Sequence, residues 1–189
     1  MRASAESAEV AWQEKCSLGT EELEARMRPG EFAQSGFLAP SESLEEVISR
    51  DAQSLQTMGV AYESIAEKLE ELFVTPITQM DYSEEEHVWK YKVGNFEISL
   101  ATTLGSQGCP FTESEGIRRF GGGGECSHST KPYAYHAGSD FKVLNLGTGE
   151  AIVCPGLITH LIRDHHFFEG SVSYRVDPEL VCRVLGLTA

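Results

Sequence analysis

The sequence predicts a mixed α+β fold, in which an N-terminal helical arm packs on a small antiparallel sheet. Apolar residues recur at helical spacing up to about residue 73. After residue 87 they alternate with polar residues, which is the period of a half-exposed strand, and glycine-containing turns separate the alternating runs. The chain has 189 residues, 41% of them hydrophobic, which is enough for one core of ordinary size.

The first part of the chain is expected to hold a helical extension, residues 1–34, followed by a helix pair over 43–73. Ser43 and Glu46 form a capping box, a pattern that satisfies backbone N–H groups at the start of a helix. The apolar stripes of the pair must be buried, because two isolated helices are marginal in water. We therefore expect residues 35–189 to form a single α+β domain that includes the helix pair.

The second part of the chain, residues 87–189, is expected to hold the sheet and a long irregular loop. Two alternating runs flank Gly94-Asn95, a turn pair that accepts the positive φ of a tight hairpin. The loop spans about residues 105–139. The elements expected after it are a second hairpin over 141–153, a helix over 157–168, a short strand over 171–176 and a final helix that Asp177 caps and Pro178 begins.

The net charge of -14 is concentrated in the helical part. Residues 1–86 hold 19 acidic and 6 basic side chains, whereas residues 87–189 hold 10 acidic and 9 basic ones. Such an acidic surface repels nucleic acid, so no nucleic-acid partner is expected. The acidic N-terminal helices are instead predicted to meet a protein partner.

The cellular compartment is predicted from two observations, the segments that the sequence lacks and the number of its cysteines. No run of about 18 apolar residues is present, so no membrane span is expected. The N-terminus lacks the apolar stretch of a secretory signal. Five cysteines are an odd number in a chain that is too large to need disulfides, which favours a reduced, cytoplasmic protein.

The long loop is the first candidate site. An irregular segment of this length is uncommon inside a compact domain, and something should hold it in place. It supplies Cys109, Cys126 and His128, whose thiolate and imidazole groups are good zinc ligands. The alternative is a glycine-rich loop without metal, in which Cys109 is a small buried apolar residue.

The helix over 157–168 is the second candidate site. His160 and Asp164 are four residues apart, so the carboxylate can orient the imidazole of a metal ligand. His165 lies five residues after His160, about 140° around a helix, which favours His160 as the ligand unless the helix ends there. Histidines on this apolar face could equally be hydrogen-bonded core residues.

Three functions remain open from the sequence. The first is a zinc-binding protein with a mainly structural site, acting through protein–protein interaction. The second is a metal-dependent hydrolase that uses the same cluster with one open position, with Glu125 or Glu169 as general base. The third is a small-anion-binding module built on Arg118, Arg119 and the glycines that follow them. The metal ligands predicted for the first two are Cys109, Cys126, His128, His160 and His165.

Overall fold

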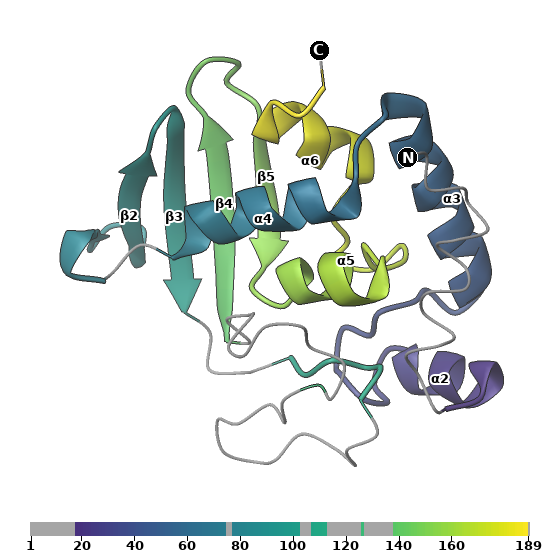
Figure 1. Ribbon diagram of the computed structural model, residues 1–189. Coiled ribbons are helices and arrows are strands. Elements are labelled where there is room, and N and C mark those ends of the chain that lie inside the picture. The colour runs from purple at the N-terminus through teal and green to yellow at the C-terminus, as the bar shows by residue number, and fades with distance from the viewer. Residues whose placement is uncertain (1–17, 75–76, 103–106, 113–125, 127–137, 189) are drawn as a thin grey trace.

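A computed structural model describes residues 18–74, 77–102, 107–112, 126 and 138–188 (Figure 1). These residues form five α-helices, a short 3₁₀ helix and a five-stranded antiparallel sheet, so the mixed α+β class predicted from the sequence is confirmed. Residues 1–17 and most of the predicted 105–139 loop lie outside the described residues. No helix among the described residues combines the length and apolar character needed to cross a membrane.

The sheet has the strand order β1-β2-β3-β4-β5, and every neighbouring pair is antiparallel. Gly94, with a φ of 55°, and Asn95 join β2 to β3. The strands are β1 (Asp81–Ser83), β2 (Val88–Val93), β3 (Phe96–Thr102), β4 (Ser139–Asn145) and β5 (Ala151–Pro155).

One strand prediction is wrong. Residues 171–176 form bends and a turn, and the fifth strand is β1, ahead of the first predicted run. The alternation in 171–176 is overridden by tertiary contacts, because Arg175 donates to both carboxylate oxygens of Asp51, on helix α3 (Leu44–Met58), and to the backbone oxygen of Glu169. These bonds fold the segment against the helices, and it pairs with none of the five described strands.

Two of the helices begin at the side-chain caps that the sequence predicts. Ser43 accepts a bond from the Glu46 N–H at the start of α3, and Gly59 ends this helix with a φ of 68°. Asp177 caps α6 in the same way. The helices are α2 (Thr20–Met27), α3 (Leu44–Met58), α4 (Tyr62–Phe73), α5 (Ile158–His165) and α6 (Pro178–Leu185), with the 3₁₀ helix η1 at Ile77–Gln79.

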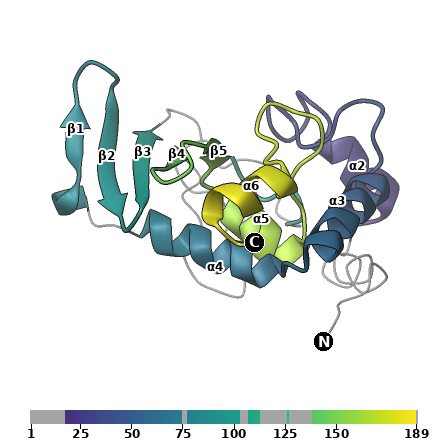
Figure 2. The ribbon, with the colours of Figure 1, turned by 90° about the horizontal axis from the view of Figure 1, so that it is seen from above.

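The helices pack on one face of the sheet. Figure 1 shows α4 crossing the strands, with α5 and α6 on either side of it, and Figure 2 shows the three on the same side of the sheet. The Phe73 ring stacks on Phe141 of β4 at 3.8 Å, and the Tyr91 hydroxyl of β2 donates to the Leu72 carbonyl oxygen. This layer buries α5, and all eight of its residues lie in the interior.

Candidate metal centre

Four cysteine and histidine side chains converge in the interior beside α5. Cys109, Cys126, His160 and His165 each offer one ligand atom, and these atoms lie within 4.8 Å of one another. Each of the four side chains is at most 3% exposed. Four of the five residues predicted from the sequence are therefore brought together, and the fifth, His128, lies outside the described residues.

The spacing of the ligand atoms fits a tetrahedral metal ion. The Cys109 Sγ lies 3.4 Å from the His165 Nε2, and the Cys126 Sγ lies 3.6 Å from the same nitrogen. A zinc ion with Zn–S bonds of about 2.3 Å and Zn–N bonds of about 2.0 Å would separate sulfur and nitrogen by about 3.5 Å. The same contacts without a metal are thiol–imidazole hydrogen bonds, so the residues fit zinc without requiring it.

Helix α5 brings two imidazoles to one point despite their five-residue spacing. The rings of His160 and His165 are 5.0 Å apart and nearly perpendicular. The predicted helix over 157–168 is wrong at its C-terminal end, because His166 adopts the left-handed conformation with a φ of 54° and ends the helix at His165. The sequence favours His160 alone unless the helix ends at this point, and it does end there. His160 and His165 are about 140° apart around the helix, but their side chains are long enough, and their rings are oriented so, that both reach one point.

Asp164 and Arg163 form a second layer around His160. The His160 Nδ1 lies 2.7 Å from the Asp164 Oδ2, which directs the Nε2 toward the cysteines. An Arg163 Nη2 lies 3.6 Å from the same Asp164 oxygen, and Arg163 also pairs with Glu70 on α4. Burial lowers the pKa of His160, but the Asp164 hydrogen bond and the contact with Cys126 outweigh it and raise the pKa above its usual value.

Cys109 and His165 are uncharged in the absence of a cation. Burial raises the pKa of the Cys109 thiol well above its usual range, although the Phe111 and Thr112 N–H groups bond to it and oppose this shift. Burial also lowers the pKa of His165 to about 4. A divalent ion would replace the thiol protons, and the N–H groups that face Cys109 suit the thiolate that results.

The Cys109 segment is held by aromatic packing that the sequence did not reveal. The Phe111 ring stacks on the His165 ring at 4.1 Å, with only 6° between the planes, and meets Phe167 edge-on at 5.8 Å. Residues 107–112 thus pass beside the end of α5 (Figure 1). Phe111 stands two residues after Cys109, which is the signal that could have indicated its place at the site.

Glu169, predicted as a general base, lies outside the four-residue group. Its side chain is fully buried, and neither carboxylate oxygen has a hydrogen-bond partner among the described residues. Burial raises the pKa of Glu169 to about 8, against the opposing charge of Arg175. The other general-base candidate, Glu125, and the predicted anion ligands, Arg118 and Arg119, lie outside the described residues.

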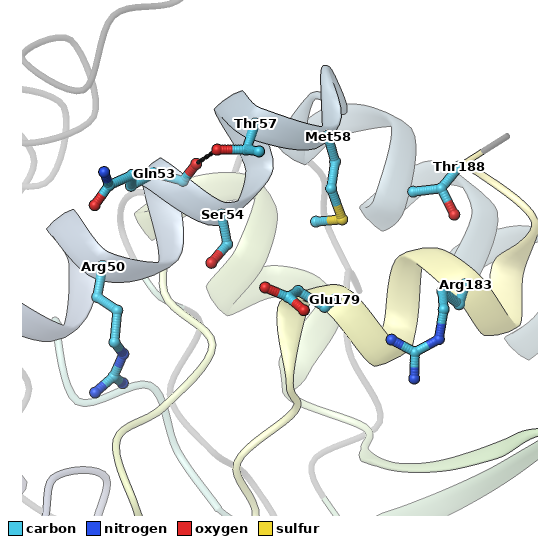
Figure 3. Close-up of a pocket in the computed structure, with 8 residues that line it drawn as sticks. All are labelled: Arg50, Gln53, Ser54, Thr57, Met58, Glu179, Arg183 and Thr188. Atoms are coloured by element: carbon cyan, nitrogen blue, oxygen red, sulfur yellow. Dashed lines mark hydrogen bonds between the residues drawn. The ribbon is translucent and has the colours of Figure 1, made fainter.

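A surface pocket lies between α3 and α6, and none of its lining residues belongs to the Cys/His group (Figure 3). Arg50 and Arg183 lie toward its two ends, with Glu179 between them (Figure 3). Each arginine already has an acidic partner, Glu42 for Arg50 and Glu150 for Arg183. The pocket therefore does not supply the anion site that the sequence suggested elsewhere.

Comparison with known proteins gives no family for this chain. No protein-family model matches it, and neither curated proteins nor solved structures give a significant match. The chemistry of the candidate centre must therefore be argued from its own geometry.

Proposed function

We propose that the protein binds one zinc ion through Cys109, Cys126, His160 and His165, and that the ion has a structural role. The observation that carries the proposal is the convergence of four buried ligand atoms within 4.8 Å. Two sulfur and two nitrogen ligands in tetrahedral spacing are the usual donor set of a structural zinc site.

A structural role is favoured over hydrolysis by the number of ligands and by their burial. Catalytic zinc keeps a coordination position for water, whereas four protein side chains would fill a tetrahedral shell. The side chains of this group are buried, which disfavours entry of a substrate. Glu169, a general base predicted from the sequence, is not among the converging residues. We therefore rank the hydrolase second.

The ion would join parts of the chain that are far apart in the sequence. Cys109 and Cys126 come from connecting segments, while His160 and His165 belong to α5. Helix α5 is in turn held to α4 by the Arg163–Glu70 pair. Zinc would add metal–ligand bonds between these segments and the helical layer, beside the packing of Phe111 on His165 and Phe167.

We further propose that the protein acts by binding a basic protein partner in a reducing, cytoplasmic environment. The excess of acidic residues before residue 87 favours such a partner and disfavours nucleic acid. The four described cysteines are free thiols, which suits a reducing compartment. Thiolate ligands also need this environment to stay reduced.

Zinc content tests the metal proposal. We expect one zinc per chain in the purified protein by elemental analysis, and loss of most of it in Cys126→Ser. Cys154→Ser is the matched control, because Cys154 is an equally buried thiol on β5 outside the group. A metal-free wild type that is folded, or equal zinc in the Cys126→Ser protein, would contradict the proposal. To separate the two roles, hydrolysis of ester and phosphoester substrates should be absent from the zinc-loaded protein.

A further inference from the structure

The β1–β2 hairpin carries an aromatic pair on the face of the sheet that the helices cover elsewhere. Tyr82 and Trp89 are directly opposite each other in the register, and their rings lie 5.0 Å apart at 55°. Tyr91 follows on the same face of β2 and is buried, with its hydroxyl bonded to the Leu72 carbonyl oxygen of α4. Tyr82, in contrast, is 48% exposed.

This aromatic pair lies beyond the hydrophobic core. Figure 2 shows β1 and β2 extending past the end of α4, which contacts β2 at Tyr91. Trp89 is half-buried, yet it is absent from the described apolar residues that pack against the core. A tryptophan is costly to leave beside water, and exposed Tyr–Trp surfaces are typical of the energetic centres of protein interfaces.

The surroundings of the pair are strongly negative. Asp81 and the turn residues Glu84, Glu85 and Glu86 are all exposed. The hairpin has two lysines, Lys90 and Lys92, and these side chains already pair with Glu86 and Glu97. The ring faces of tyrosine and tryptophan are themselves electronegative, so rings and carboxylates favour the same kind of ligand, a cation.

The hairpin also holds its tyrosine in a defined position. The Tyr82 hydroxyl lies 3.3 Å from the His87 Nδ1. His87 adopts a left-handed backbone with a φ of 56°, an unusual conformation for a residue with a side chain. The bond links the hydroxyl to the turn and leaves the ring available for contact. A ring fixed in this way loses less conformational entropy when a partner stacks on it.

We propose that the Tyr82–Trp89 surface binds an arginine-bearing segment of a protein partner. An arginine guanidinium is planar, so it stacks on an aromatic ring while its edge pairs with a carboxylate. The aromatic pair provides the stacking surface, and the adjoining turn provides the exposed carboxylates of Glu84 and Glu85. Lysine, a compact and strongly hydrated charge, would bind more weakly. This inference does not depend on zinc, and it places the contact on the sheet hairpin and not on the N-terminal helices.

Trp89 fluorescence tests the inference directly. In full-length protein carrying Trp12→Phe, Trp89 is the single tryptophan. We expect a synthetic arginine-rich nonapeptide to change its fluorescence saturably, and a lysine-rich peptide of equal charge to bind at least threefold more weakly. Tyr82→Ala should weaken binding of the arginine peptide about tenfold. Tyr82→Leu, which keeps an apolar side chain, should lose nearly as much if the aromatic ring is what binds.

A matched charge control separates this surface from general attraction to an acidic protein. Glu84→Gln/Glu85→Gln should weaken binding at least fivefold, whereas Glu63→Gln/Glu67→Gln, which removes two exposed charges from α4, should change it less than twofold. Equal losses in the two double variants, or Tyr82→Ala binding within twofold of the parent, would overturn the inference. Tighter binding of an acidic peptide or of duplex DNA would overturn it as well. Circular dichroism checks that each variant is folded.

Discussion

Two buried polar sites lie close together in the sequence, and the free-energy cost of burying their polar groups is offset in different ways. At the Cys/His group, each side chain lies within reach of three other ligand atoms, and His160 has Asp164 behind it. Four residues after His165, the Glu169 carboxylate is equally buried but has no hydrogen-bond partner among the described residues. The first arrangement suits a cation, whereas the second suits a neutral, protonated acid. Burial alone therefore does not identify a functional site, because convergence of complementary groups is also needed.

Removal of the metal should have the largest effect of any change at either site. If zinc links the Cys109 segment to α5, chelation should lower the free energy of unfolding by several kcal/mol, on the order of 5 kcal/mol, because a structural ion binds only the folded chain. Thermal unfolding with and without a strong chelator measures this loss. Re-addition of zinc should restore the melting temperature. A melting temperature that is the same with and without the chelator would contradict the structural role.

Glu169→Gln should change how the free energy of unfolding depends on pH. The pKa of Glu169 is raised from 4.5 to about 8, so the folded protein holds a proton that the unfolded chain releases between these values. The free energy of unfolding should therefore fall as pH rises from about 4.5 to 8 and level off above 8. Glu169→Gln removes this contribution and should stabilise the protein by a few kcal/mol above pH 8, with little effect near pH 4.5. Urea unfolding of both proteins from about pH 4.5 to above pH 8 measures this difference in stability. Equal stabilisation at every pH would contradict the argument that burial raises the pKa of Glu169.

Asp164→Asn should affect the metal group and leave the Glu169 site unchanged. Asparagine keeps the size of the side chain but loses the charge that orients and polarises His160, so zinc affinity should fall about 10- to 100-fold. Competition with a fluorescent chelator measures the affinity. Asp140→Asn on β4 is the control for a charge lost outside the group. Equal zinc affinity in Asp164→Asn and the parent would show that the carboxylate has no such role.

Arg163→Met should give the smallest effect. Its guanidinium pairs with Glu70 and lies 3.6 Å from Asp164, so the substitution weakens the link between α4 and α5 while the His160–Asp164 bond remains. We expect a loss of about 1–2 kcal/mol in the free energy of unfolding, because the pair is partly buried. Zinc affinity should change less than in Asp164→Asn, and the reverse order would place Arg163 closer to the ion than the geometry indicates.

Sequence patterns predicted the local features and the residue types at the site. The fold class and the caps at Ser43 and Asp177 are confirmed. These features depend on neighbours along the chain or on side-chain chemistry, which one sequence contains. Cys109, Cys126 and the α5 histidines are good metal ligands by their side-chain chemistry, and the structure places them within reach of one another.

What the sequence could not provide depends on distant contacts. The alternation of 171–176 resembles a strand, but Arg175 bonds to Asp51, 124 residues away, and the segment turns instead. Strand β1 has only three residues, too short for a period to stand out. Glu169 looked like a base beside the histidines, yet its backbone is left-handed with a φ of 66°, and its side chain is not among the metal-site residues.

X-ray absorption at the zinc edge tests the central claim most directly. The proposed site predicts a tetrahedral shell of two sulfur atoms at about 2.3 Å and two imidazole nitrogens at about 2.0 Å. In Cys126→Ser, any zinc that remains should have one sulfur ligand. A shell dominated by oxygen, or two sulfur ligands retained in Cys126→Ser, would contradict binding by Cys109, Cys126, His160 and His165.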